Sequence, residues 1–244
     1  MTDLLEMRDV SVRFGGLAAV SNASLTIAPR EVHALIGPNG AGKSTVINCI
    51  SGFQRLAAGE LFLNAVPLAH MAPSAVARRG IARTFQTPQL FGRLSVADNI
   101  RVAHQRLNRA ETGVAPLSVE ELVRLVGLSG SEDVPAERLA YGQQRLLEVA
   151  RALATAPQLL LLDEPAAGLS SEEVDRLASL VRMIAGELGI SVLFVEHNVP
   201  LVRRIADRIT VMNHGLVIAA GAPENVLAVP AVITAYLGTA AVEH

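Results

Sequence analysis

The feature that most constrains the fold of this chain is the segment Gly37–Thr45. It reads Gly-Pro-Asn-Gly-Ala-Gly-Lys-Ser-Thr and matches the pattern G-x-x-x-x-G-K-[ST]. The apolar run Glu31–Ile36 before it predicts a buried strand, and Ser44–Ser51 after it predicts a helix. In such a unit the glycines let backbone N–H groups approach phosphates closely, and the helix N-terminus attracts the same anion. The segment therefore predicts a P-loop nucleotide site.

Two side chains of this segment carry chemistry of their own. Lys43 supplies a mobile cation for the β- and γ-phosphates, and Ser44 offers a hydroxyl to Mg²⁺. By itself the segment predicts only that the chain binds a nucleotide, and it leaves hydrolysis to be argued from other residues. The residues expected to contact the nucleotide are Gly37, Pro38, Asn39, Gly40, Ala41, Gly42, Lys43, Ser44 and Thr45.

A second acidic feature adds hydrolysis to this prediction. The apolar run Leu159–Leu162 predicts a buried strand that ends in Asp163 and Glu164. Acids at the end of a buried strand are costly unless they bind a cation. Asp163 stands where a P-loop ATPase holds the Mg²⁺ shell, and Glu164 follows it where a carboxylate can polarise the attacking water.

Composition excludes several other classes of protein. Half of the 244 residues are apolar but only 3% are aromatic, so the core must be aliphatic. No run of 18 uncharged apolar residues exists to span a bilayer, and buried parallel strands explain the mean hydropathy of +0.37 better. A net charge of −2 gives no reason to expect nucleic acid binding. The single cysteine, Cys49, and an acidic N-terminus favour a cytoplasmic protein whose membrane role comes through a partner.

The order of predicted elements indicates one α/β domain, residues 1–244, with an insertion. Short alternating runs at 10–14 and 23–27 predict antiparallel strands joined through Gly15-Gly16, and 59–63 predicts another strand. Residues 88–156 show helical patterns, a polar loop around 108–116 and no convincing strand. Strands are then predicted at 159–162, 192–195, 209–212 and 216–220, with a helix at 172–188.

We therefore expect a mostly parallel sheet in a nucleotide-binding core formed by residues 1–87 and 157–244, with an antiparallel β subdomain. Residues 88–156 are expected to form a helical subdomain. In the helix at 172–188 the apolar side chains fall on one face, and Ser170 with Glu173 predicts a capping box at its start.

Beyond these features the chain resembles the ABC ATPase family, and the resemblance covers essentially all of it. The segment Leu139-Ala-Tyr-Gly-Gln-Gln-Arg is similar to the family signature. In the family this segment reaches over the γ-phosphate held by the opposite subunit. The resemblance thus implies a P-loop ATPase core in a dimer, with the partner's site completed by Ala140, Tyr141, Gly142 and Gln143. Gly142 would permit close approach, and a helix from Gln143 would present its N-terminus.

Three single residues match further family motifs. Gln86, in Arg-Thr-Phe-Gln-Thr, matches the glutamine loop, which contacts Mg²⁺ and the attacking water and links the core to the helical insertion. His197 matches the switch histidine that touches the γ-phosphate. Phe14 matches the aromatic residue that stacks on adenine. The implied metal-binding set is Ser44, Gln86 and Asp163, and the implied catalytic set is Lys43, Gln86, Glu164 and His197.

The chain departs from the common family pattern at three positions. Ala140 stands where the signature usually carries Ser, which removes one hydroxyl hydrogen bond to phosphate, worth about 1–3 kcal/mol. Ser170 stands where an Asp is usual, and Asn198 follows His197 where an acid is common. We expect ATP turnover to be retained but tuned differently, because the backbone N–H groups of the signature remain.

Finer motifs resemble one subfamily, the ATPases of branched-chain amino-acid importers. They are Phe14-Gly-Gly-Leu, Gly80-Ile-Ala-Arg-Thr-Phe-Gln, Ala140-Tyr-Gly-Gln-Gln, Glu164-Pro-Ala-Ala-Gly-Leu and Ala235-Tyr-Leu-Gly. Urea- and amide-importing relatives look similar. The resemblance implies a peripheral protein at the cytoplasmic face of the inner membrane. Its implied partners are a second ATPase subunit, identical or paralogous, integral membrane permeases and, indirectly, an extracytoplasmic solute-binding protein.

Three alternatives share parts of these motifs. A soluble ABC ATPase acting on DNA or ribosomes fits poorly, because the span from Ser51 to Leu139 has no heptads for a coiled coil and the chain has only one such domain. A motor for export or lipopolysaccharide transport shares all the catalytic residues and stays open. A nucleotide-sensing module without turnover is disfavoured by the complete set of Lys43, Asp163, Glu164 and His197.

Overall fold

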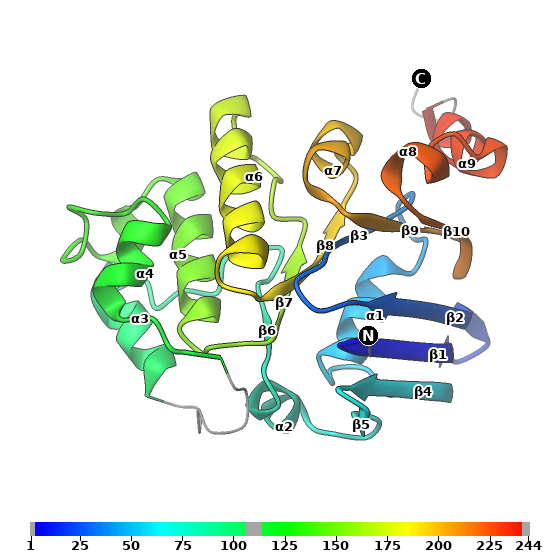
Figure 1. The fold of residues 1–244 in the computed structure, drawn as a ribbon, viewed down its shortest axis with the longest axis horizontal. Helices are drawn as coiled ribbons and strands as arrows, with labels where there is room; N and C mark the ends of the chain where they lie inside the picture. Colours follow the sequence, from blue (N-terminus) through cyan, green and yellow to red (C-terminus); the bar gives the residue numbers. More distant parts are fainter. Residues whose placement is uncertain (1–2, 106–113, 241–244) are drawn as a thin grey trace.

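The computed structural model describes residues 3–105 and 114–240, and its centre is a six-stranded sheet with the order β10-β9-β3-β8-β7-β6 (Figure 1). All neighbouring strands in it run parallel except β9 and β10, which form an antiparallel pair. The strands are β3 (Val32–Ile36), β6 (Ile81–Arg83), β7 (Leu159–Asp163), β8 (Ser191–Glu196), β9 (Arg208–Asn213) and β10 (Leu216–Gly221). The predicted mostly parallel sheet and the α/β class are confirmed.

A second, antiparallel sheet has the order β2-β1-β4-β5. Its strands are β1 (Leu5–Phe14), β2 (Leu17–Ile27), β4 (Ala58–Leu63) and β5 (Val66–Pro67). The strands predicted at 10–14 and 23–27 are therefore too short. Each prediction stopped near a residue with a positive φ that interrupts the inward–outward alternation of side chains, which is Asp9 (φ 47°) in β1 and Asn22 (φ 48°) in β2.

The central strands are buried on both faces because their side chains alternate between two clusters. On β7, Leu159 and Leu161 join the cluster shared with the antiparallel sheet, while Leu160 and Leu162 join the cluster under the other helices. Helix α1 (Lys43–Ile50) contacts β2 and β7, one strand from each sheet. Continuous apolar runs are the expected sequence of such doubly covered strands.

The other face of the six-stranded sheet is covered by α6 (Ser171–Gly186) and α7 (Val199–Ile205). The predicted capping box is present, since Ser170 Oγ accepts from Glu173 N and Glu173 Oε2 accepts from Ser170 N. The last described elements are the helices α8 (Pro223–Val226) and α9 (Pro230–Ala240). In the described residues no helix is both long and apolar enough to cross a membrane.

The predicted helical insertion contains α3 (Val96–His104), α4 (Val119–Leu125), a short 3₁₀ turn (Ala136–Arg138) and α5 (Tyr141–Leu153). These helices gather at the end of the molecule away from β1, β2 and β4 (Figure 1). Most of the polar loop predicted around 108–116 lies outside the described residues. Helix α5 begins at Tyr141 rather than Gln143.

Several short elements were not predicted, among them α2 (Pro73–Arg78), β5 and β6. Each is too short to show a hydrophobic period. The strand β6 nevertheless matters for the site, because it pairs with β7 at the edge of the sheet and ends in Arg83.

Candidate functional site

The loop between β3 and α1 requires glycine at two positions. A Cβ at Gly37, where φ is 151°, would lie 2.1 Å from the carbonyl oxygen of Met212. A Cβ at Gly42, where φ is 104°, would lie 2.7 Å from the carbonyl oxygen of Ala19. Gly42 is also the N-cap of α1 and makes no side-chain cap bond. The first N–H groups of α1 therefore remain available to an anion, as the sequence predicts.

Lys43 is held inside this loop. Its Nζ donates hydrogen bonds to the carbonyl oxygens of Gly37 at 2.7 Å and Pro38 at 2.9 Å. Burial lowers the pKa of Lys43, and the nearby charges of Glu164 and Asp163 partly offset this effect. A buried cation of this kind gains from an anionic ligand, because a phosphate would compensate its lost hydration.

A pocket of about 340 Å³ opens over the loop. It is lined by seven of the nine residues predicted from Gly37–Thr45 and by Glu164, which come from different parts of the chain. The predicted lining residues are Asn39, Gly40, Ala41, Gly42, Lys43, Ser44 and Thr45. A nucleotide's phosphates would meet backbone N–H groups, an ammonium and a carboxylate here.

The wall of the pocket nearest β2 was not predicted. It is formed by Leu17, Ala18 and Ala19, with His214 and Gly215 from the β9–β10 turn. Phe14 does not line the pocket; it pairs with Leu17 across the hairpin and is 51% exposed. The stacking of Phe14 on adenine therefore stays a prediction, and Phe14 is not among the residues that line this pocket.

The structure brings Gln86 and Glu164 together. Gln86 Nε2 donates to Glu164 Oε2 at 2.9 Å, although the two residues lie far apart in the sequence. Glu164 has a φ of 47°, which is uncommon for a residue with a side chain, and its N–H donates to Val195 O at 3.0 Å. The strained backbone turns the Glu164 carboxylate into the pocket that Lys43 and Ser44 line.

Asp163 ends β7 and is 7% exposed. Its Oδ2 accepts a hydrogen bond from Arg83 Nη2 at 2.9 Å. This partner was not predicted, although Arg83 lies within the motif Gly80-Ile-Ala-Arg-Thr-Phe-Gln that carries the resemblance. The available signal was an arginine directly after the apolar pair Ile81-Ala82, because an arginine that becomes buried in a strand needs an acidic partner.

The residues predicted to bind Mg²⁺ fit a hard cation. The Ser44 hydroxyl and the Asp163 carboxylate offer oxygen ligands near Lys43, and Gln86 contacts Glu164 beside them. In the described part of the chain, no group of three or more His, Cys, Asp or Glu side chains could hold a metal unaided. A magnesium ion here would draw its remaining ligands from nucleotide phosphates and water.

His197 follows β8 and is exposed; it does not line the pocket over the loop. The residue before it, Glu196, is 1% exposed and was not predicted. Glu196 Oε1 accepts from Ala166 N at 2.9 Å, and Oε2 accepts from His197 N at 3.1 Å and Asn198 N at 3.3 Å. One buried carboxylate thus fixes the backbone after β7 and the backbone of His197.

The signature segment lies at the start of α5. Ala140 is the N-cap, and its N–H donates to Gln143 Oε1 at 3.1 Å. Tyr141 is exposed, with the guanidinium of Arg145 stacked 5.3 Å from its ring centre. Of the four predicted signature residues, Ala140, Tyr141, Gly142 and Gln143, none lines the pocket formed by the chain's own P-loop.

Comparison with known proteins agrees with this geometry. The family model described as ABC transporter matches residues 20–167, more than half of the chain. The chain is 40% identical to the high-affinity branched-chain amino acid transport ATP-binding protein LivG of Escherichia coli (strain K12), over 97% of this chain and 98% of LivG. It is 39% identical to BraF of Pseudomonas aeruginosa, which carries the same description, over the same shares.

A solved structure shares the fold. The ADP conformation of MJ1267, an ATP-binding cassette of an ABC transporter, matches with a TM-score of 0.86 at 30% identity, over 98% of this chain and 100% of that one. The P-loop pocket, the carboxylates that end β7 and this full-length likeness point to the same conclusion. The chain belongs to the ABC transporter family and is one of its ATP-binding, ATP-hydrolysing subunits.

Proposed function

We propose that this subunit drives an importer of branched-chain amino acids or related small polar solutes. The observation that carries the proposal is the near-complete overlap with LivG and BraF, at 40% and 39% identity over 97% of the chain. A ribose import protein of Streptomyces coelicolor, RbsA 1, is 37% identical over 88% of this chain, but the match covers only 43% of RbsA 1. The shared length favours the LivG type.

Catalysis in this proposal is positioning and charge neutralisation. Lys43 binds the β- and γ-phosphates from within the P-loop, and Glu164 orients the attacking water. Gln86, hydrogen-bonded to Glu164 Oε2, holds that carboxylate toward the pocket. His197 contacts the γ-phosphate from the loop that Glu196 fixes. Magnesium bound by Ser44, Asp163 and Gln86 would neutralise charge on the phosphates.

A second subunit completes each site. The segment Ala140–Gln143 lies outside the pocket of its own P-loop, and Tyr141 exposes 43% of its surface there. An N-terminal helix turn with an exposed face suits a phosphate that a partner ATPase subunit, identical or paralogous, carries. Two such subunits would close head-to-tail over two ATP molecules.

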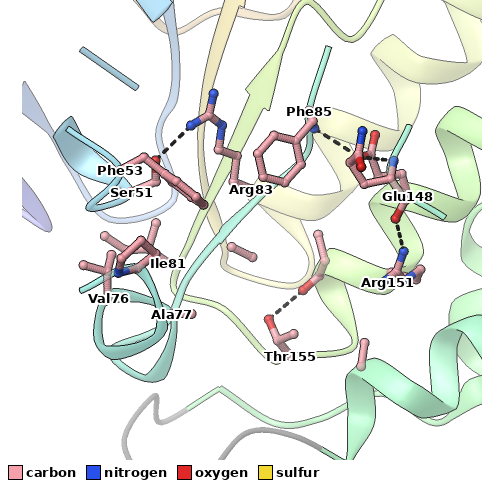
Figure 2. Close-up of a pocket in the computed structure, with 15 residues that line it drawn as sticks. Ser51, Phe53, Val76, Ala77, Ile81, Arg83, Phe85, Glu148, Arg151 and Thr155 are labelled. Atoms are coloured by element: carbon pink, nitrogen blue, oxygen red, sulfur yellow. Dashed lines mark hydrogen bonds between the residues drawn. The ribbon is translucent and has the colours of Figure 1, made fainter. Parts of the chain in front are cut away.

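A permease would bind where the core meets the helical insertion. A pocket of about 320 Å³ lies there, and we call it the junction pocket (Figure 2). Its main apolar lining residues are Phe53, Val76, Ala77, Ile81 and Phe85. Phe53 remains 58% exposed, and such an apolar hollow suits a cytoplasmic segment of the membrane subunit. The chain would then sit at the cytoplasmic face of the membrane.

Uptake of labelled leucine by the native host tests the substrate assignment. Deleting the gene is expected to abolish leucine uptake at low external concentration and to leave ribose uptake unchanged. The wild-type gene should restore leucine uptake, whereas Lys43→Ala should not, because it lacks the phosphate-binding cation. Unchanged leucine uptake, or a loss confined to ribose, would contradict the proposal.

A further inference from the structure

Arg83 connects the junction pocket to the metal-side carboxylate. It ends β6 and lines the junction pocket, while its Nη2 donates to Asp163 Oδ2 at 2.9 Å. The side chains of Arg83 and Asp163 are each only 10% exposed. One guanidinium therefore touches both a surface where a partner can bind and the carboxylate proposed for the magnesium–nucleotide complex.

The guanidinium is fixed on several sides. Its Nη1 donates to Asn48 Oδ1 at 2.6 Å and to Ser51 Oγ at 3.0 Å, both at the end of α1. Its carbon lies 5.0 Å from the ring centre of Phe85 and 5.8 Å from that of Phe53. Figure 2 shows Arg83 extending between these two rings toward Ser51.

The two rings also brace each other. Phe53 and Phe85 meet edge to face, with ring centres 6.1 Å apart and planes at 84°. Both rings line the junction pocket, so any segment that fills it presses on the groups that flank the guanidinium. A lysine could not make these contacts together, because it lacks the planar fork that bonds two partners while it stacks.

Such an arginine can act on a carboxylate in two opposite ways. As a fixed clamp on Oδ2, it would leave Oδ1 available to a magnesium ion or its water ligands and would strengthen metal binding. As a competing cation, it would only neutralise Asp163 and weaken metal binding. The contacts to Asn48, Ser51, Phe53 and Phe85 hold the guanidinium independently of Asp163 and favour the clamp.

We propose that Arg83 is a positioning residue that fixes the Asp163 carboxylate for the magnesium–nucleotide complex and ties its position to the two rings of the junction pocket. The inference rests on the proposed role of Asp163 as a magnesium-shell carboxylate. It adds a route from the permease-facing surface to the metal side of the site, distinct from the contact between Gln86 and Glu164.

The affinity for ADP, measured by calorimetry in EDTA and in Mg²⁺, tests this without ATP hydrolysis. We call the increase in ADP affinity from EDTA to Mg²⁺ the magnesium gain. Arg83→Met should leave the affinity for ADP in EDTA unchanged and reduce the magnesium gain by about tenfold or more. Arg83→Lys should recover part of the gain, because it restores the charge but not the fork. Phe85→Leu should reduce the gain less than Arg83→Met, since it removes one ring and keeps the clamp.

Arg151→Met is the matched control. Arg151 stacks on another ring, 4.9 Å from the centre of Phe91, and lies beside Glu148 rather than Asp163. It should keep the wild-type gain. Thermal unfolding without nucleotide identifies any variant that fails to fold. If Arg83→Met fails to fold, Phe85→Leu and Arg83→Lys still test the inference.

Three outcomes overturn the inference. The first is a wild-type or larger magnesium gain in Arg83→Met, the second is an equal loss in Arg151→Met, and the third is an unchanged gain in Phe85→Leu. A wild-type chain that binds ADP equally well in EDTA and Mg²⁺ would instead contradict the magnesium site itself, and with it this inference. The failure of the proposed function is thereby distinguished from the failure of the Arg83 clamp alone.

Discussion

Glu196 shows how single buried charges organise this site. Its two carboxylate oxygens accept three backbone N–H groups, from Ala166, His197 and Asn198, at distances of 2.9–3.3 Å. The loop after β7 and the loop after β8 therefore share one anchor. These hydrogen bonds exist only in the folded chain, so Glu196 stabilises the fold. Glu196 also fixes the backbone of His197.

Replacing Glu196 with Ala should lower the free energy of unfolding by about 3 kcal/mol or more, because three buried N–H groups lose a charged acceptor. Urea denaturation followed by circular dichroism measures this. Glu187→Ala, at the exposed end of α6, is the control and should change stability by no more than about 0.5 kcal/mol. A Glu196→Ala variant as stable as that control would show that the anchor is not needed.

For single residues, the sequence predicts the functional role of those that lie in motifs. It misses residues whose role depends on a partner that is distant in the sequence. Lys43, Ser44 and Glu164 were predicted and line one pocket, because the motif itself fixes their local geometry. Arg83 and Glu196 were not predicted, since the acid and the N–H groups that justify their burial come from other strands and loops.

At the scale of elements, the signature helix α5 is packed against the start of α6. A Cβ at Gly142 would lie 2.0 Å from Glu173 Oε1. Glu173 is not free to move without cost, because its Oε2 accepts from Ser170 N at 2.8 Å and Ser170 Oγ at 2.9 Å. The same bonds with Ser170 hold the pKa of Glu173 below its usual value. The capping box of one helix thus limits the residue allowed in the other.

A double-mutant cycle tests this coupling. Gly142→Ala should lower the free energy of unfolding by about 1 kcal/mol more in the wild-type chain than in a Glu173→Ala background. In the wild-type chain the new methyl group displaces Glu173 from Ser170, whereas in the Glu173→Ala background that cap is already absent. In the second background, alanine should be neutral or stabilising, since it is the better helix former. Urea denaturation of the four proteins gives the coupling. Equal effects of Gly142→Ala in both backgrounds would contradict the packing.

Long elements were predicted with boundary errors, and short ones were missed. The helix at 172–188 was recognised from its apolar face and its capping box, and it spans Ser171–Gly186. Elements such as β6, with only Ile81–Arg83, carry no periodic signal. The strand β6 forms because it pairs with β7 and packs against α5, and the local sequence does not reveal these contacts.

At the scale of the whole molecule, the parallel sheet assembles the site. In register, Ile36 of β3 pairs with Glu196 of β8, and Asp163 of β7 pairs with Val195 of β8. The carboxyl ends of three strands therefore meet at one edge, where the P-loop, Glu164 and His197 follow them. The general arrangement could be predicted from alternating strands and helices, but the register that aligns these ends required the structure.

One hydrophobic cluster also joins the helical insertion to the core. It contains Ile100 of α3 and Leu147 of α5 together with Leu162 of β7 and Phe194 of β8. A shared core makes the two parts mechanically continuous, so a force on the insertion reaches the strands that carry the site. In the proposed transporter, such a shared core would let a permease bound at the helical insertion affect the strands that carry the site.

In the proposed mechanism, Glu164 orients the water that attacks ATP bound over the P-loop. Phosphate release by the purified chain, with magnesium and with the Glu164→Gln variant alongside Glu187→Gln, tests it most directly. We expect Glu164→Gln to keep ATP binding and to lower the rate of phosphate release by about 10²-fold or more, while Glu187→Gln keeps the wild-type rate. Near-wild-type turnover by Glu164→Gln would contradict this role of Glu164.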